Sequence, residues 1–252
     1  MIASHPQSRG FGPYLRKELR EWWKSRAALV TLVAVAALGI IGTLAARIDE
    51  WIGGSPTLGT LEPTANVLGA KFDQWILFTC IFASIGLLTQ ERASGTLAWT
   101  LSKPMSRRWL LVAKWTAAMV MLALFAVVLP LAVSVAVATW SYGGVPDLAS
   151  VARYGLVLLG LPAFFVALNL ALATRVNSQA AIAAVAFAVT ATPYFLGGFL
   201  PQAAELWPSS IAAMAAPFAT ESMVHLPTVA SWALALVAIG ALGLVSFNRE
   251  DM

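Results

Sequence analysis

The chain has 252 residues, of which 59% are hydrophobic and only 11% are charged. Soluble domains carry about 25% charged residues, so this composition excludes a soluble protein of this size and indicates a membrane protein. The formal charge of +4 does not indicate nucleic-acid binding, because lysine and arginine in a membrane protein mainly report its topology.

An amphipathic segment opens the chain over 13–26. Leu15, Leu19, Trp22 and Trp23 recur at helical spacing and form one face, while basic residues spread over the remainder. Such a helix lies in the membrane interface, with tryptophans at headgroup depth and cations toward anionic lipid. Two interpretations stay open: a surface anchor alone, or an elbow that transmits motion to the first span.

Six later segments are apolar enough to cross a membrane, which takes about 20 residues. The third is overlong, so we expect it to include a cytoplasmic extension. Prolines at 130, 162 and 193 are expected to kink their helices. The six segments are 27–46, 72–89, 109–140, 154–174, 180–200 and 229–247.

Lysine and arginine set the orientation of these spans. If the N-terminus is inside the cell, thirteen of the 16 basic residues fall in inside segments. This asymmetry predicts that both termini are cytoplasmic and requires an even number of spans. We therefore expect an all-α membrane protein, in which residues 1–252 form a single transmembrane domain of six helices.

The cytoplasmic loop 91–108 joins the second and third spans. Ser94 is a suitable N-cap for a short helix over 95–102, Pro104 ends that helix, and Ser106 can cap the next one. Apolar side chains on this loop have no obvious partner in the chain, which suits insertion into a groove of another protein. These are Leu97, Trp99, Leu101 and Met105.

The outer segment 201–227 precedes the last span and is too long for a turn and too apolar for an ordinary loop. Four prolines divide it. We expect one or two short helices that lie at the outer leaflet or dip into it, where non-helical backbone must be covered by protein or face water. A lid packed on the span ends is the alternative.

Small residues crowd two of the spans. Alanines recur over 180–188, and Gly240 and Gly243 lie in the last span. Small side chains allow helices to approach closely. Their use could be packing within one chain or the face of a dimer.

The spans hold no ionisable residue that stands out as a site. Asp73 and Lys114 lie near span ends, where their side chains can reach the headgroups. Ion-coupled transporters and intramembrane hydrolases need buried charged or nucleophilic groups, so neither class is favoured. Cys80 is expected to be a buried apolar side chain, and we expect no catalytic, cofactor-binding or metal-binding residues in this chain.

Several short motifs occur in a fixed order along the chain. In this order it resembles the ABC-2 type transporter permeases, which carry E-R-x-x-G-T-L, then L-L-S-x-P-x-S-R, then G-K. The nitrous-oxide-reductase-associated and antibiotic-export permeases share this pattern. Residues 17–21 and 247–251 fit it too, whereas Ala113 replaces the usual glycine and Ala93-Ser94 stand where charge is common. The matching residues are Glu91-Arg92, Gly95-Thr96-Leu97, Leu101-Ser102-Lys103-Pro104, Ser106-Arg107 and Lys114.

The resemblance implies a dimeric pathway of two permease chains, identical or paralogous, in the cell membrane of a bacterium or archaeon. Each chain would seat its short helix, the coupling helix, in a separate ATP-binding subunit, and the direction of transport would be export. The apolar spans, with a few hydroxyl and amide groups, suit an amphiphilic or hydrophobic substrate. The outer segment would be re-entrant. The implied docking residues are Ser94, Gly95, Thr96, Leu97, Leu101, Lys103 and Pro104. We also hypothesise that charged residues brace the elbow helix, the coupling helix and the second span against one another: Glu18, Arg20, Glu91, Arg92 and Arg107.

The sequence contains no G-x-x-x-x-G-K-[ST] phosphate-binding loop. We therefore expect this chain not to be an enzyme, with ATP and magnesium bound by the partner subunit. Membrane lipid is an expected partner and nucleic acid is not. The alternative is a membrane scaffold or regulator that docks a cytoplasmic protein without transporting anything.

Overall fold

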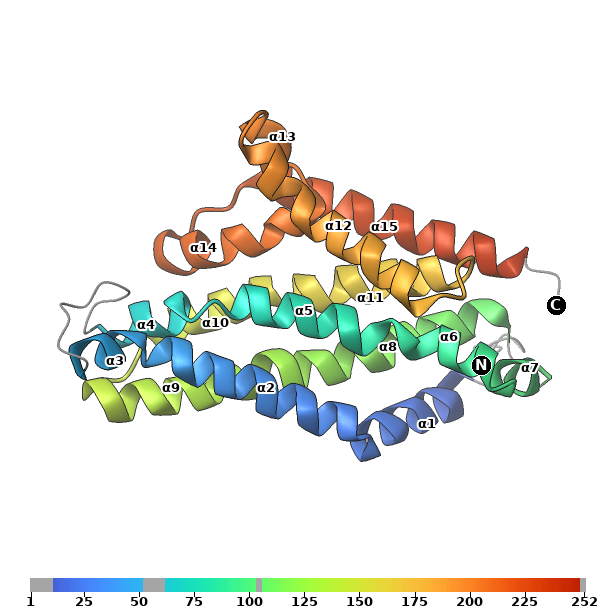
Figure 1. The fold of residues 1–252 in the computed structure, drawn as a ribbon, viewed down its shortest axis with the longest axis horizontal. Helices are drawn as coiled ribbons and strands as arrows, with labels where there is room; N and C mark the ends of the chain where they lie inside the picture. Colours follow the sequence, from blue (N-terminus) through green and yellow to red (C-terminus); the bar gives the residue numbers. More distant parts are fainter. Residues whose placement is uncertain (1–10, 52–61, 103–105, 250–252) are drawn as a thin grey trace, which may run out of the picture.

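The structure is a computed structural model and describes residues 11–51, 62–102 and 106–249. The regular secondary structure of these residues is entirely helical, in an elongated bundle (Figure 1). The first half of the chain forms α1 (Phe11–Lys24), α2 (Arg26–Thr43), α3 (Ala45–Trp51), α4 (Pro63–Gly69), α5 (Phe72–Ser84), α6 (Gly86–Ala93), α7 (Thr96–Leu101), α8 (Arg107–Leu122) and the π-helix η2 (Ala123–Val128).

The second half of the chain completes the bundle. It consists of α9 (Leu129–Tyr142), α10 (Leu148–Leu158), α11 (Gly160–Ala173), α12 (Gln179–Gly197), α13 (Pro201–Glu205), the 3₁₀-helix η3 (Pro208–Met214), α14 (Ala215–Glu221) and α15 (Leu226–Asn248). Helices α1, α7 and the last turn of α15 lie at one end, here called the α7 end (Figure 1).

Five helical stretches are long and apolar enough to cross a membrane: Pro63–Ala93, Arg107–Tyr142, Leu148–Ala173, Gln179–Gly197 and Leu226–Asn248. A sixth is added if α1 and the helix after it, which meet at a bend of 56°, are counted as one span. Five of the six expected spans are therefore found. The sixth depends on counting α1, the expected interfacial elbow, together with α2 as one bent span. The second span is longer than expected, because α4 precedes α5 on the same rod.

Prolines explain two irregularities in these rods. A proline has no N–H to donate, and its ring clashes with the carbonyl four residues earlier. The wider π-turns of η2 lie directly before Pro130 and make room for that clash. In α12, Pro193 leaves the carbonyl of Val189 without its helical donor, and the indole N–H of Trp207 donates to that oxygen at 2.7 Å.

Helix α11 lies at the centre of the bundle and contacts α5, α8, α12 and α15. In the span that contains it, 72% of the most apolar stretch is buried, against 11% for α12 and for α15. The bundle core is therefore built around α11. Helices α12 and α15 turn most of their apolar surface outward, toward lipid or another chain.

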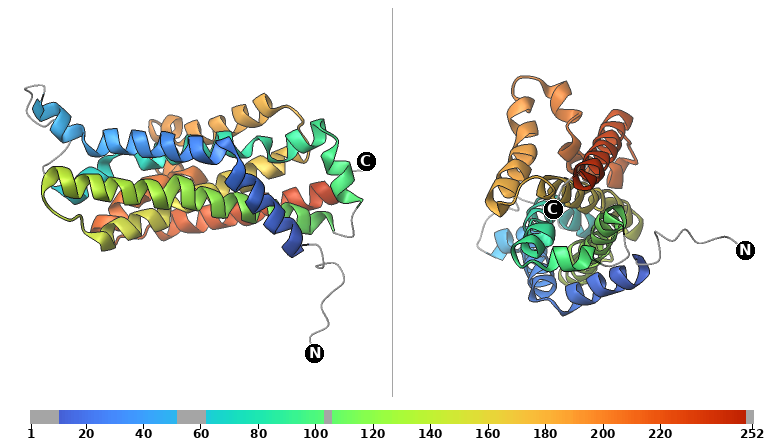
Figure 2. Two further views of the ribbon diagram at one scale, coloured as in Figure 1. Left: turned by 90° about the horizontal axis from the view of Figure 1, so that it is seen from below. Right: turned by 90° about the vertical axis from the view of Figure 1, so that its right-hand side faces the viewer.

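The elbow segment forms α1, which packs on α8 at the α7 end (Figure 2). Its buried residues are Tyr14, Glu18 and Trp22, whereas Trp23 is 65% exposed. The expected face of Leu15, Leu19, Trp22 and Trp23 is therefore wrong in part. The face that packs against the bundle is formed by Tyr14, Glu18 and Trp22, so the carboxylate of Glu18 lies at its centre.

The outer segment forms three short helices rather than one or two: α13, η3 and α14. Helix α14 packs along α10, and η3 packs against α15. The hydroxyl of Ser209, on η3, donates a second hydrogen bond to the Val189 carbonyl, at 3.2 Å. The segment is therefore anchored to the span before it through the carbonyl that Pro193 releases.

Candidate functional site

The turn between α6 and α7 depends on Gly95, whose φ of 72° lies in the left-handed region. The amide of Ser94 donates to Gln90 O at 3.0 Å, and that of Gly95 donates to Arg92 O at 3.1 Å, so both bonds close the end of α6. A glycine at this place ends a helix without strain. Ser94 therefore caps the end of α6, and its expected role as N-cap of the following helix is wrong.

The short helix expected over 95–102 is α7, which is six residues long. Ser94, Gly95 and Thr96 are exposed, but Leu97 is 2% exposed and packs inside this chain. The expectation that Leu97 lacks a partner in the chain is therefore wrong, and it offers no docking surface. The side chains of Trp99 and Leu101, and the whole of Lys103, Pro104 and Met105, lie outside the described residues.

Three charged side chains meet beside this turn. The Nζ of Lys114, on α8, lies 2.9 Å from Glu91 Oε1 on α6 and 3.2 Å from Glu18 Oε1 on α1. Lys114 is 2% exposed, and its ammonium also lies 5.8 Å from the ring centroid of Tyr14. Glu18, Glu91 and Lys114, here called the ion cluster, join the elbow, the helix before α7 and the helix after it.

The ion cluster has strong energetic consequences because it is buried. Removing one charge from a buried pair leaves the other uncompensated and typically costs about 3–5 kcal/mol. An ammonium between two carboxylates fixes the relative position of three helices more tightly than apolar contact alone, since its hydrogen bonds are directional. A displacement of α6 must therefore carry α1 and α8 with it.

Arg92 joins α6 to another part of the bundle. Its guanidinium donates to the carbonyls of Ala173 at 2.7 Å and Thr174 at 3.2 Å, and to Asn177 Oδ1 at 2.9 Å. The two carbonyls belong to the end of α11, where the helix dipole is negative and a cation is stabilising. Arg92 thus ties the helix before α7 to the central helix of the bundle.

Two more arginines complete the connections at this end. Arg107, at the start of α8, donates to Phe247 O near the end of α15, at 3.3 Å. Arg175, after α11, donates to the hydroxyl of Ser246 on α15. Together with the ion cluster, these bonds connect α1, α6, α8, α11 and α15 directly around the base of α7.

The structure brings together four of the five expected bracing residues: Glu18 and Glu91 in the ion cluster, and Arg92 and Arg107 at helix ends. Arg20 is exposed on α1, and the described contacts give it no place in this network. Lys114 was expected to reach the headgroups, and this is wrong. Its signal in the sequence was its position as a lone charge inside the long apolar run 109–140.

The comparisons with known proteins identify the family. The sequence pattern that defines the ABC-2 family transporter proteins matches residues 14–252, nearly the whole chain. The chain belongs to the ABC-2 transporter family. A comparison with curated proteins finds no match.

Membership of the ABC-2 family, together with several membrane-length apolar helices, makes the chain a multi-pass membrane permease. Permeases of this family associate with an ATP-binding subunit of an ABC transporter. The network around α7 therefore lies in a protein whose family associates with an ATP-binding subunit.

Proposed function

We propose that this ABC-2 permease exports an amphiphilic or hydrophobic substrate, driven by ATP hydrolysis in a separate subunit that docks at the α7 end. The α7 end then faces the cytoplasm of a bacterial or archaeal cell. ATP and magnesium are bound by the partner, so this chain carries no hydrolytic chemistry of its own. Two permease chains, identical or paralogous, form the pathway.

The observation that carries this proposal is the set of charged connections around α7. A force applied to the exposed turn Ser94-Gly95-Thr96 acts on α6, which ends at this turn and is joined to α8 by the ion pair of Glu91 with Lys114. The ion cluster passes the displacement to α1, Arg92 passes it to α11, and Arg107 passes it to α15. Closure of an ATP-binding subunit at this turn would therefore move the bundle as connected helices.

Docking at this turn is tested by affinity capture. The tagged permease is purified from detergent-solubilised membranes with and without Thr96→Arg, which places a bulky cation on an exposed docking position. We expect the unaltered chain to retain an ATP-binding subunit and the variant to lose most of it. Thr220→Arg makes the same change at an exposed position on α14 and should leave capture unchanged.

A non-transporting scaffold is the competing function, since it would also expose a docking helix. The two functions differ in what the captured complex does. Reconstituted in vesicles, a transporter hydrolyses ATP faster when substrate is present and moves that substrate across the bilayer. Capture of an ATP-binding subunit whose hydrolysis drives no movement of any amphiphile tested would favour the scaffold and contradict export.

A further inference from the structure

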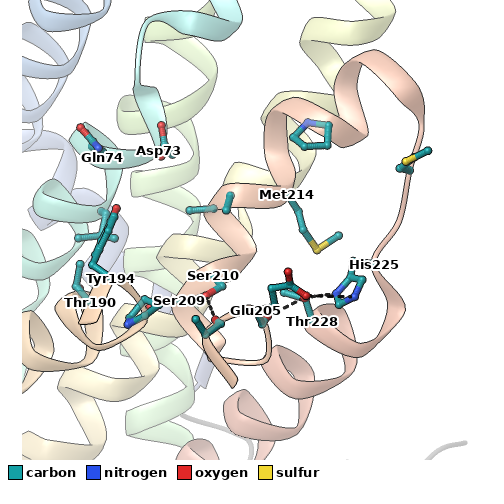
Figure 3. A pocket seen from close by; sticks show the side chains of 17 residues that line it. Asp73, Gln74, Thr190, Tyr194, Glu205, Ser209, Ser210, Met214, His225 and Thr228 are labelled. Atoms are coloured by element: carbon teal, nitrogen blue, oxygen red, sulfur yellow. Dashed lines mark hydrogen bonds and ion pairs between the residues drawn. The ribbon is translucent and has the colours of Figure 1, made fainter. Parts of the chain in front are cut away.

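A cavity of about 530 Å³ lies between α5, α12 and the short helices of the outer segment (Figure 3). Cavities of about 300–1,000 Å³ suit a small organic ligand. Asp73 and Tyr194 lie on one side of it, and Glu205, Met214 and His225 lie on the other. Side chains from three spans, α5, α12 and α15, and from the outer segment therefore converge on one space.

Hydrogen bonds hold the outer segment, which forms one side of this cavity, against α12 and the start of α15. Trp207 and Ser209 both donate to the Val189 carbonyl that Pro193 releases in α12. The hydroxyl of Thr228, at the start of α15, donates to Glu205 O at 2.8 Å and lies 2.6 Å from His225 Nδ1. The cavity is thus bounded by anchored backbone, as expected of a site that exists before its ligand arrives.

The charge of the cavity has one sign. Its lining includes two carboxylates, Asp73 and Glu205, and none of the described residues that line it is a lysine or arginine. The nearest basic partner of Glu205 is the imidazole of His225, with Nε2 at 3.9 Å from Oε2. Lys71 is exposed two residues before Asp73 and does not line the cavity.

Several of the other side chains that line the cavity are apolar, aromatic or polarisable. Leu77 is buried behind the space, Tyr194 presents an aromatic ring, and Met214 presents a thioether. An aromatic face attracts organic cations, and thioethers adapt to irregular apolar bodies. Anions would meet two carboxylates in a lining whose one basic side chain among the described residues is the imidazole of His225, which disfavours anions electrostatically.

We propose that this cavity binds a cationic amphiphile: an apolar body that carries a single amine, quaternary ammonium or phosphonium charge. The inference rests on the proposed export function and narrows it to a substrate class. The cation lies between Asp73 and Glu205, and the apolar body packs against Leu77, Tyr194 and Met214. The site lies far from the α7 end, at the outer segment, which is the side on which an exported ligand would leave.

The test uses a matched pair of probes of the same shape and opposite charge, tetraphenylphosphonium and tetraphenylborate. The full chain is reconstituted in nanodiscs of phosphatidylcholine, and binding is measured by equilibrium dialysis against empty nanodiscs. We expect saturable binding of tetraphenylphosphonium above the empty-disc level and no saturable binding of tetraphenylborate. Saturable binding of both ions equally would overturn the charge assignment and indicate an apolar lipid-chain cavity.

Variants then locate the bound cation. Asp73→Asn changes α5 and Glu205→Gln changes α13, so a local folding defect in one variant is absent from the other. We expect each to raise the Kd severalfold and the pair together to raise it about tenfold, as for partly exposed ion pairs. Glu221→Gln removes an exposed outer carboxylate that does not line the cavity and should leave the Kd unchanged. An unchanged Kd in the double variant would overturn the proposal.

A substitution that fills the cavity tests the location of the binding site independently of its charge. Ala212→Trp adds an indole to a half-buried lining position and should abolish saturable binding. The outcomes also separate this inference from the export function. Capture of an ATP-binding subunit without tetraphenylphosphonium binding leaves the proposed export function intact and removes the ligand class. Tetraphenylphosphonium binding without any captured subunit supports the ligand class and contradicts the proposed docking.

Discussion

At the scale of single residues, Lys114 connects more elements than any local pattern suggests. Its ammonium contacts carboxylates that come from two other helices, and the partner on α1 is 96 positions away in the sequence. A lysine so placed cannot reach the headgroups, because its side chain is enclosed by α1, α6 and α8. Its charge is therefore balanced inside the protein, and each of its partners depends on it.

Removing this charge should destabilise the permease strongly. Lys114→Met keeps the length of the side chain but leaves Glu18 and Glu91 facing each other without a cation. We expect a loss of about 3–5 kcal/mol in the free energy of unfolding, measured by thermal denaturation in detergent. Lys17→Met is the control, because Lys17 forms an exposed pair with Glu21 on the same elbow helix. Its cost should be about 0.5 kcal/mol or less. Equal losses in the two variants would contradict the importance of burial.

Arg92 is a second residue whose charge is matched to a helix end. Reversing it with Arg92→Glu places a carboxylate against the carbonyls of Ala173 and Thr174, where the dipole repels an anion. We expect the variant to remain in the membrane and to hydrolyse ATP with its partner while transport falls severalfold or more. The measurement is the ratio of transported substrate to hydrolysed ATP in vesicles.

The control for Arg92 is Arg108→Glu, the same reversal at an exposed position in the first turn of α8. It should leave the ratio near that of the unaltered chain. A ratio that is unchanged by Arg92→Glu would mean that the bond to α11 holds the fold together without carrying motion.

At the scale of elements, the turn into α7 depends on one backbone conformation. A Cβ on Gly95 would meet no atom within 4 Å, so the cost of substitution there is conformational and not steric. Gly95→Val should cost about 1–2 kcal/mol at a φ of 72°, whereas Gly95→Asn should cost less because asparagine tolerates this region.

Because α7 carries the proposed docking surface, the backbone strain at Gly95 should appear in partner capture. We expect Gly95→Val to recover clearly less ATP-binding subunit than Gly95→Asn, measured by quantitative affinity capture at equal permease levels. Equal recovery would show that docking does not depend on the angle at which α7 leaves α6.

The helices could be predicted from the sequence where the length of an apolar run determines their bounds. The third span, expected over 109–140, is observed over Arg107–Tyr142, because an uninterrupted apolar run leaves little choice. The inward face of α1 was not predictable in the same way. Glu18 reads as a polar residue on a polar face, and only the distant Lys114 makes its burial favourable. The anchoring of the outer segment likewise depends on a carbonyl that Pro193 releases.

At the scale of the whole molecule, α12 exposes a row of small residues on the outer surface of the bundle. The two uses expected for the alanines over 180–188 divide among them. Ala186 is buried in the core of this chain, whereas Ala184 and Ala188 are exposed and have no such packing role. In a membrane, small side chains on an exposed helix face let a neighbouring helix approach closely. The second permease chain that the family resemblance implies therefore has a suitable contact surface on α12.

We propose that two copies of this chain associate through this row, in which case a bulky side chain on it should prevent their association. Ala184→Trp is expected to shift the purified permease from dimer to monomer, measured by light scattering with the detergent contribution subtracted. Ala241→Trp makes the same change at an exposed alanine of α15 and should leave the dimer intact. If Ala241→Trp alone dissociates the dimer, the contact lies on α15, and α12 faces lipid. Since Tyr194 lies on α12 and also lines the outer cavity, a dimer through α12 would place two such cavities near the shared pathway.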